Sequence, residues 1–277
     1  MNFLYGKSVA ERILGDVKKK IAESGITPGL AVVLVGDDKA SQIYISLKEK
    51  KAREIGFYFE KHLFLADAKT EEIVNLIKVL NGKPNIHGIL VQLPLPPRMD
   101  TDAIITAIAP AKDADGFHKE TIEKFLAEGK DCIPIFPRAI LEMAKESGTP
   151  LNKKKAVIVV NSALFGNVLQ KALESEGLTV KIIQSTEVEK HKDALKEADV
   201  VVTACGRPGL IKRDMVPNAV LIIDGGISEA HGKTVGDLAR GSFEGTDILI
   251  SPVPGGVGPV TVACLLRRTV ELAGVEV

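Results

Sequence analysis

The sequence has few of the residues that build metal sites, disulfide frameworks and membrane spans. Its three cysteines, Cys132, Cys205 and Cys264, are too few and too widely spaced for a disulfide scaffold or a zinc site, and its five histidines do not cluster. There is no run of about 18 apolar residues, so we expect no membrane span. The N-terminus has no basic stretch followed by an apolar one, so we expect no secretory signal. These absences predict a cytoplasmic protein that binds no metal.

A surplus of either charge is also missing. Lys and Arg number 36 and Asp and Glu number 36, so the formal net charge is zero. Proteins that coat nucleic acid or an anionic membrane rely on a surplus of basic residues. We therefore expect neither a nucleic acid nor a membrane as a partner.

Aromatic residues are scarce, at 4% of the chain with no Trp, while hydrophobic residues make up 45% and charged residues 26%. This composition is typical of a globular protein whose core is built from Val, Ile, Leu and Ala, which suits buried parallel strands. At about 150 residues per domain, the 277 residues predict two domains.

Segments with strand character alternate with helical patterns, which predicts an α/β fold with a parallel sheet. The predicted strands are 30–35, 87–91, 156–160, 179–183, 200–204, 220–223 and 248–250. The predicted helices are 9–23, 41–55, 70–81, 138–146, 164–176, 190–196 and 259–273. The glycines expected to form left-handed caps at helix ends are Gly25, Gly56, Gly82, Gly148 and Gly177.

Two stretches predict where the chain passes between domains. Residues 129–137 change from a charged stretch to an apolar, Pro-containing one, and residues 251–259 are rich in Pro and Gly. If the last helix returns to the first lobe, the chain crosses between lobes twice. Ligand sites are frequent at such interfaces.

Tyr44 and Lys48 are four residues apart in a predicted helix, so they share one helix face. Like-charge repulsion from Lys50, Lys51 and Arg53, together with burial, would lower the pKa of Lys48 toward the range of an acid or base. The alternative is a solvated, charged helix with one amphipathic Tyr.

Two further motifs follow at predicted strand ends. Gln92 ends a buried strand and precedes a proline-rich loop, at the sheet edge where ligands bind in open α/β folds. A simple connector is the alternative. Asp113 and Asp115 either accept hydrogen bonds from a heterocycle or form an Asx turn before Gly116.

The last two motifs are rich in backbone signals. In residues 251–261, three glycines allow the backbone to approach a ligand closely. Pro259 suits the first turn of a helix, whose free N–H groups attract anions. The alternative is a flexible hinge. Residues 156–176 form a strand–turn–helix without the G-x-G-x-x-G fingerprint, so an ordinary helix capped by Asn161 or Ser162 is the alternative to a cofactor site.

Together, in their order along the chain, these stretches resemble the bifunctional methylenetetrahydrofolate dehydrogenase/cyclohydrolase family, from Tyr5 to the final helix. The motifs that carry the resemblance are Ala40-Ser41-x-x-Tyr44-x-x-x-Lys48, Val91-Gln92-Leu93-Pro94-Leu95-Pro96, Lys112-Asp113-Ala114-Asp115-Gly116-Phe117, Gly206-Arg207-Pro208-Gly209-Leu210-Ile211, Ile223-Asp224-Gly225-Gly226-Ile227, Gly236-Asp237-Leu238 and Pro252-Val253-Pro254-Gly255-Gly256-Val257-Gly258-Pro259.

The resemblance implies that the protein oxidises 5,10-methylene-tetrahydrofolate to the methenyl form and hydrolyses that product to 10-formyl-tetrahydrofolate. It implies a homodimer and a cofactor that is NADP by family default, with NAD as the other candidate. It implies a catalytic, folate-binding domain of residues 1–133, completed by 257–277, and a Rossmann-like NAD(P)-binding domain of residues 134–256.

The resemblance also assigns roles to residues. Lys48 is expected to be the acid/base residue, Gln92 to orient it, Tyr44 to pack on the folate and Asp115 to accept hydrogen bonds from the pterin. The expected substrate-binding residues are Tyr44, Gln92, Leu93, Pro94, Asp115, Pro254, Gly255, Gly256, Pro259 and Thr261. The expected cofactor-binding residues are Asn161, Ser162, Gly166, Ser185, Ala204, Cys205, Gly206, Arg207 and Ile227.

The chain departs from the family pattern on the cofactor side. The family's cofactor turn reads Gly-Arg-Ser-x-x-Val-Gly-x-Pro, and this chain has Asn161 in place of the Arg. The family's Pro-Cys-Thr-Pro segment corresponds here to residues 134–137, which lack the Thr hydroxyl. We therefore expect weakened phosphate recognition, with Arg207, Lys190 or Lys192 as the substitute cation. The alternative function is a cyclohydrolase with weakened or lost dehydrogenase activity.

Overall fold

The computed structural model describes residues 1–129, 132–230 and 232–277, which form two compact units. One unit, here called the three-stranded unit, comprises residues 11–124 and 262–277. The other, the six-stranded unit, comprises residues 1–10 and the described part of 125–261. Lys130 and Asp131, which fall within the predicted crossing at 129–137, lie outside the described residues. The predicted domain limits themselves stay a prediction.

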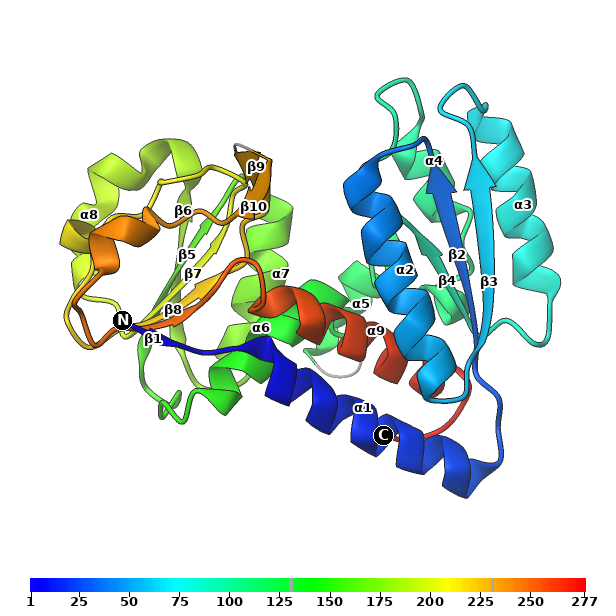
Figure 1. Cartoon of the computed structure of the whole chain (residues 1–277), viewed down its shortest axis with the longest axis horizontal. Helices are drawn as coiled ribbons and strands as arrows, with labels where there is room; N and C mark the ends of the chain where they lie inside the picture. The colour runs from blue at the N-terminus through cyan, green and yellow to red at the C-terminus, as the bar shows by residue number, and fades with distance from the viewer. Residues whose placement is uncertain (130–131, 231) are drawn as a thin grey trace. The chain divides into compact units, whose positions relative to one another are not determined.

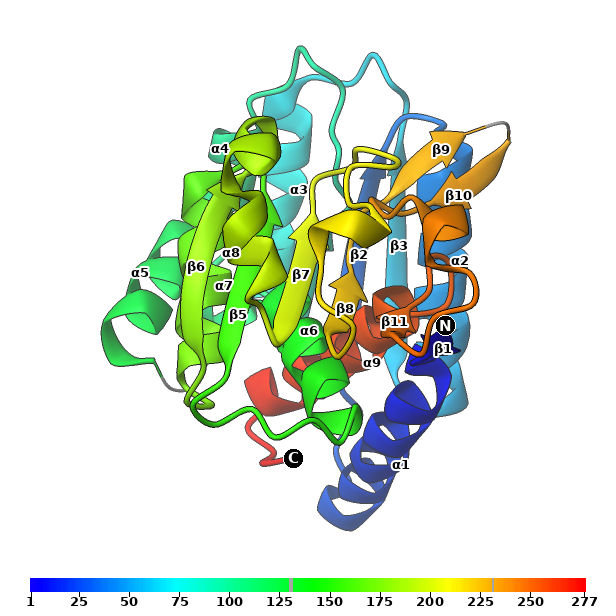
Figure 2. The same ribbon diagram turned by 90° about the vertical axis from the view of Figure 1, so that its left-hand side faces the viewer.

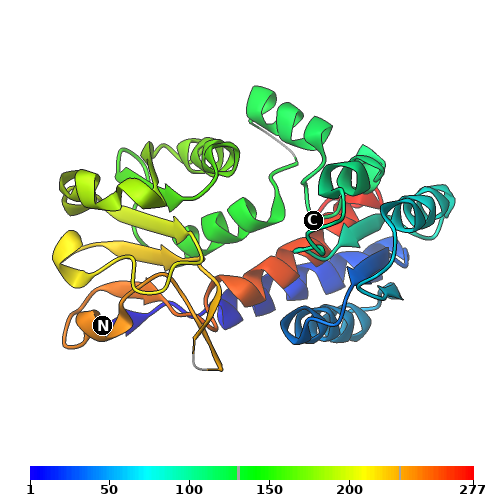
Figure 3. The ribbon, with the colours of Figure 1, turned by 90° about the horizontal axis from the view of Figure 1, so that it is seen from above.

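The three-stranded unit is built on a parallel sheet in the order β3-β2-β4. Its strands are β2 (Gly29–Val35), β3 (Tyr58–Phe64) and β4 (Gly88–Val91). The central strand, β2, is apolar and buried along its whole length, as expected for a strand covered on both faces. Figure 3 shows helices α2 (Lys39–Glu54) and α3 (Thr70–Gly82) on opposite sides of this sheet.

Each face of β2 packs against one of these helices. Ala31 and Val33 share a buried cluster with Ile73 and Ile77 of α3. The alternate residues of β2 point the other way, toward α2. Asp38 caps α2, because its side chain accepts a hydrogen bond from the backbone N–H of Ser41 at 2.7 Å. The cap places the start of α2 at Lys39, four residues after the last residue of β2.

Further elements complete the unit and hold the segment around residue 115 in place. They are α4 (Thr101–Thr106), the short 3-10 helix η1 (Pro110–Lys112), the first part of α5 (Lys119–Glu128), most of α1 (Gly6–Ser24) and the part of α9 (Val257–Leu272) from residue 262 onward. A Cβ atom at Gly88 would lie 3.0 Å from Thr269 of α9 and 3.1 Å from Ala114. Because β4 carries a glycine here, both segments pack directly on the strand.

The six-stranded unit has a parallel sheet in the order β1-β11-β8-β7-β5-β6, which Figure 2 shows side by side. The strands are β1 (Asn2–Phe3), β5 (Lys155–Val160), β6 (Thr179–Gln184), β7 (Val200–Ala204), β8 (Leu221–Asp224) and β11 (Leu249–Ser251). Apart from the edge strand β1, the strands follow the doubly wound order 2-1-3-4-5, in which ligands bind at the carboxyl ends of the strands, as they do in Rossmann folds.

Helices cover both faces of this sheet. Leu195, just before the end of α8 (Lys192–Lys196), shares a buried cluster with Val157 and Val159 of β5. On the other face, α7 (Ala163–Glu174) approaches the sheet at Gly166, where a Cβ atom would lie 3.0 Å from Ile182 of β6. Figure 1 shows these helices with α6 (Ile135–Glu146), which also packs against α7.

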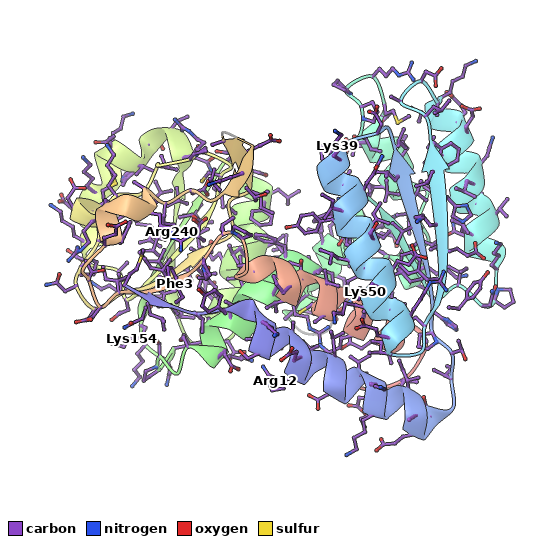
Figure 4. All side chains as sticks on the ribbon, viewed as in Figure 1. Phe3, Arg12, Lys39, Lys50, Lys154 and Arg240 are labelled. Carbon is purple, nitrogen blue, oxygen red and sulfur yellow. The ribbon has the colours of Figure 1, made fainter. Side chains whose placement is uncertain are left out.

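Smaller elements occupy the loops of the six-stranded unit. They are the 3-10 helices η2 (Ser185–His191), η3 (Arg213–Met215) and η4 (Arg240–Phe243) and an antiparallel hairpin of β9 (Ser228–Ala230) and β10 (Lys233–Val235). The edge strand β1 is fixed by backbone hydrogen bonds to residues next to and within β11 and by Arg240, whose guanidinium carbon lies 4.6 Å from the ring centre of Phe3 (Figure 4).

Every predicted strand and helix is present, with ends shifted by a few residues, and the α/β class is confirmed. The prediction missed β3, whose alternating exposed and buried residues mark a sheet edge, and the short elements α4, α5, β1, β9 and β10. The predicted helix 190–196 was partly wrong, because residues 185–191 form a 3-10 helix. Gly82 was wrong as a left-handed cap: it is the last residue of α3, while Gly25, Gly56, Gly148 and Gly177 have positive φ angles.

Candidate active site

Lys48 and Gln92 meet in the three-stranded unit. The Lys48 Nζ atom donates a hydrogen bond to Oε1 of Gln92 at 2.8 Å. Gln92 directly follows β4, and its Nε2 group donates to the backbone oxygen of Leu93 at 2.8 Å. Because the amide N–H is used in this way, the amide oxygen faces the lysine. The structure thus brings together two residues that the family resemblance assigned to one site.

Burial lowers the pKa of Lys48, and the negative charge of Asp115 opposes this effect. The expected like-charge repulsion is not the cause: Lys51 and Arg53 form ion pairs with glutamates on α2, and Lys50 is exposed. The lysine is therefore tuned by loss of water around its amino group rather than by neighbouring cations.

Asp113 and Asp115 have different roles in the same turn. The buried Asp113 carboxylate accepts hydrogen bonds from the backbone N–H groups of Gly116 at 2.9 Å and His118 at 2.9 Å, so it forms the turn. The carboxylate of Asp115 accepts no hydrogen bond from any residue in the described part of the chain. Burial raises its pKa to about 6, and the attraction of Lys48 only partly offsets this.

Tyr44 lies one helical turn before Lys48 on α2. Its side chain is half-buried, and burial raises the pKa of its hydroxyl. Leu93 is half-buried and Pro94 exposed, and the peptide bond between them is cis. Tyr44, Lys48, Gln92 and Asp115 all belong to the three-stranded unit.

The glycine-rich segment that precedes α9 belongs to the six-stranded unit. The Gly255 oxygen accepts a hydrogen bond from the Gly6 N–H at 2.9 Å, and Gly255 has a φ of 103°, a conformation that favours glycine. Gly256 N–H donates to the Pro252 oxygen at 2.6 Å. Of the remaining expected substrate residues in this segment, Pro254 is exposed, and Pro259 and Thr261 are half-buried. The Thr261 hydroxyl donates to the Gly258 oxygen at 2.7 Å.

On the cofactor side, Ser162 is the N-cap of α7, since its Oγ accepts the Phe165 N–H at 3.3 Å. Asn161 is not a cap: its Nδ2 group donates to the Cys205 oxygen at 2.5 Å and its Oδ1 accepts from the Ser185 hydroxyl. Ser162 rather than Asn161 is therefore the cap, and Asn161 links the loops after β5, β6 and β7.

Arg207 joins this link. Its Nη1 group donates to the backbone oxygen of Ser185 at 3.0 Å and to Ser185 Oγ at 3.2 Å. The other two expected substitute cations are engaged elsewhere: Lys190 pairs with Glu187 at 3.6 Å and Lys192 with Glu189 at 2.5 Å.

The other expected cofactor residues line the same sheet edge. Ala204 ends β7, Gly206 has a φ of 61°, and a Cβ atom there would lie 3.4 Å from the backbone oxygen of exposed Ile227. The thiol of Cys205 is buried and donates to the Val159 oxygen at 3.1 Å, and burial raises its pKa to about 12. Cys205 thus offers its backbone, not a reactive thiolate.

Two buried aspartates that sequence reasoning did not assign hold this edge together. Asp237 accepts the backbone N–H groups of Cys205 at 2.8 Å and Arg207 at 2.6 Å. Asp224 accepts the N–H groups of Gly226 at 3.0 Å and Asp237 at 3.0 Å, and burial raises its pKa to about 6. A signal was present in the sequence, because each aspartate lies next to a glycine in a family motif.

The replaced Pro-Cys-Thr-Pro segment supplies an aromatic ring instead of a hydroxyl. Phe136 packs against Phe165, with ring centres 5.5 Å apart, and its ring reaches the position where a Cβ atom of Gly225 would lie. Among the described residues, no group of three or more His, Cys, Asp or Glu side chains could hold a metal ion. Nor does the described part of the chain contain a helix with the length and apolar character of a membrane span.

The architecture and these groups define an α/β enzyme class with a Rossmann-like nucleotide-binding domain. The profile of the tetrahydrofolate dehydrogenase/cyclohydrolase catalytic domain matches residues 4–115, and that of the NAD(P)-binding domain matches residues 134–276. The chain therefore belongs to the tetrahydrofolate dehydrogenase/cyclohydrolase family, which confirms the family predicted from the sequence.

Known relatives resemble the chain over nearly its whole length. It is 40% identical to the bifunctional protein FolD of Pelobacter propionicus over 273 residues, or 97% of this chain and 96% of the relative. The crystal structure of the Campylobacter jejuni methylenetetrahydrofolate dehydrogenase/cyclohydrolase superposes with a TM-score of 0.91 at 35% identity, covering 99% of both chains. The Trypanosoma brucei enzyme, solved with NADP and an inhibitor, gives a TM-score of 0.90 at 30% identity over 97% of this chain and 95% of that one.

Proposed function

We propose that this chain oxidises 5,10-methylene-tetrahydrofolate with NADP or NAD and hydrolyses the methenyl product to 10-formyl-tetrahydrofolate. The observation that carries the proposal is the desolvated Lys48 amino group, held by Gln92 and coupled to the charge of Asp115. This arrangement supports acid/base chemistry next to a cationic intermediate, and the two matched domains support the pairing of oxidation with hydrolysis.

Asp115 and Tyr44 are the proposed folate contacts. A pterin presents an edge of N–H donors, and the Asp115 carboxylate has acceptor capacity that no described residue uses. The half-buried ring of Tyr44, one turn from Lys48, offers a flat apolar face for a bicyclic ligand. Leu93 and Pro94, next to Gln92, are proposed to border the same ligand.

Lys48 is the proposed acid/base residue of the hydrolysis. The methenyl carbon is cationic, so a permanent ammonium beside it would be repelled, and a lowered pKa reduces this conflict. As a neutral amine, Lys48 takes a proton from the water whose oxygen bonds to the methenyl carbon. As an ammonium, it returns that proton to the nitrogen whose bond to this carbon breaks, and Gln92 keeps Nζ oriented throughout. The second proton of the water is released to solvent when the hydroxyl oxygen becomes the formyl C=O.

The six-stranded unit is the proposed cofactor domain, and its residues fit a dinucleotide. The N-terminus of α7, the left-handed backbone at Gly206 and the guanidinium of Arg207 all lie at the carboxyl edge of the sheet. A nicotinamide cofactor held by these residues would supply the hydride acceptor for oxidation of the methylene carbon. Gly255 and Gly256 offer backbone without side chains that would obstruct a ligand.

A homodimer also remains a proposal, as the family resemblance implies. The cytoplasmic location expected from the sequence stays a prediction.

The test is a two-wavelength assay that follows methenyl formation and methenyl hydrolysis separately, with NADP and with NAD. We expect Lys48→Met to abolish hydrolysis while folate binding, measured by calorimetry, remains. Lys51→Met, which removes an exposed lysine from the same helix, is the matched control and should hydrolyse at the wild-type rate. Wild-type hydrolysis by Lys48→Met would overturn the assignment of the base.

A further inference from the structure

A pocket of about 330 Å³ lies in the six-stranded unit where β6 and β7 end. Ser185, the first residue after β6, lines it together with Arg207 and Lys212. In Rossmann-like folds the end of the second strand of the first βαβ unit faces the adenosine ribose, where NAD enzymes carry an Asp or Glu and NADP enzymes use a nearby Arg. Here β5, α7 and β6 form that unit, and Ser185 stands where the carboxylate would be.

Asn161, which stands where the family pattern has an Arg, helps to position Arg207 through Ser185. Asn161 is fixed by its hydrogen bond to the Cys205 oxygen and holds the Ser185 hydroxyl, and Ser185 in turn accepts Nη1 of Arg207 at 3.2 Å. Asp237 fixes the same loop from behind through the Arg207 backbone N–H at 2.6 Å. The guanidinium is thus held at the pocket although its side chain is exposed.

The charges around the pocket favour an anion. Within the described residues, Nε and Nη2 of Arg207 have no hydrogen-bond acceptor, and Lys212 has no carboxylate within ion-pair distance. The pocket does contain one acid, Glu189, but Lys192 pairs with it at 2.5 Å. Arg207 and Lys212 therefore offer unused donors to the pocket, and its one carboxylate, Glu189, is already paired.

We propose that Arg207, presented by Ser185 and Asn161 and assisted by Lys212, binds a phosphate monoester on the ribose of the dinucleotide, so that this chain selects NADP. The inference rests on the proposed function and deepens its cofactor assignment. The family turn has an Arg at the position of Asn161, and in this chain Arg207 makes the phosphate contact in its place. A guanidinium suits this task because its planar donors match phosphate oxygens in pairs.

The test is calorimetric binding of two fragments to the intact protein, 2′,5′-ADP and 5′-AMP, which differ in the ribose phosphate. A charge-assisted hydrogen bond corresponds to about a 10- to 150-fold change in affinity. We expect Arg207→Gln to weaken 2′,5′-ADP by this factor without changing 5′-AMP, and Arg207→Lys to retain part of the difference. The NADP-to-NAD ratio of kcat/KM should fall in parallel.

Lys190→Met is the matched control. It removes a cation from η2, which begins at Ser185, but Lys190 does not line the pocket, so both affinities should stay unchanged. Equal binding of the two fragments by the wild type, or an unchanged preference in Arg207→Gln, would overturn the proposal. Stimulation of NAD turnover by inorganic phosphate would also count against it, since the pocket would then serve free phosphate. Fragment binding needs no folate, so these results are independent of the proposed reactions.

Discussion

The ionisation of Asp115 connects the proposed pterin contact to the stability of the fold. Burial raises the pKa of Asp115 to about 6 from an ordinary value of 3.8. Between these two values the folded chain binds more protons than the unfolded chain does, so the free energy of unfolding decreases as pH rises. The contribution of Asp115 is thus most favourable below about pH 4 and is lost as pH rises through about 6.

The loss can be worked out from these pKa values. The difference in bound protons between about pH 5 and about pH 7 integrates to about 1.3 kcal/mol, and partial solvent exposure reduces it to about 1 kcal/mol. An Asp115→Asn variant has no titrating group at this position. We therefore expect the wild type to lose about 1 kcal/mol more than this variant over the interval, or about 2–4 °C in Tm.

The measurement is urea unfolding of both proteins at the two pH values. Asp37→Asn, which removes an exposed carboxylate from the loop before α2, controls for the change in net charge and should follow the wild type. Parallel pH profiles for the wild type and Asp115→Asn would refute the reasoning. The carboxylate would then be solvated or satisfied, and it would no longer stand out as a free acceptor for a pterin.

Two further predictions concern the framework of each unit. In Gly226→Ala the new Cβ would lie 2.2 Å from Cγ of Asp237, so we expect thermal unfolding to show a destabilisation of more than about 2 kcal/mol. Gly15→Ala, with open space around the Cβ, should not destabilise, and equal Tm values for the two variants would contradict the argument. Asp38→Ala should remove the cap of α2 and cost about 0.5–2 kcal/mol near neutral pH. The Ser41 N–H lowers the pKa of Asp38, so this difference should vanish as pH falls well below about 4; a difference that persisted in acid would contradict the cap.

The regular elements and the placement of Tyr44 and Lys48 on one helix face were predictable because their signals are local. A fully apolar β2 and a glycine near the end of several helices are read directly from residue order, and Tyr44 and Lys48 share a helix face by spacing alone. β3 was missed because it is a sheet edge, where every second residue is exposed and the apolar signal is diluted.

Long-range contacts were not predictable from the residues alone. Nothing in the local sequence indicates that Asn161 bonds to Cys205 or that Asp237 holds the backbone of Arg207, since these pairs are brought together only by the strand order. The cause of the lowered pKa of Lys48 was misjudged for the same reason. Counting cations in the sequence cannot reveal that Lys51 and Arg53 are already paired.

The short strand β1 bears on the order in which the chain becomes structured during synthesis. Asn2 and Phe3 pair with Leu249 and Ile250 of β11, and the three-stranded unit includes residues 262–277, whose Arg268 donates to the Asp113 oxygen at 3.3 Å. Neither unit can reach its final packing until residues 249–277 have left the ribosome. Closing loops of this length is slow compared with forming local helices and hairpins. The growing chain must therefore keep an incomplete six-stranded sheet, and a three-stranded sheet that still lacks α9, from associating with other chains.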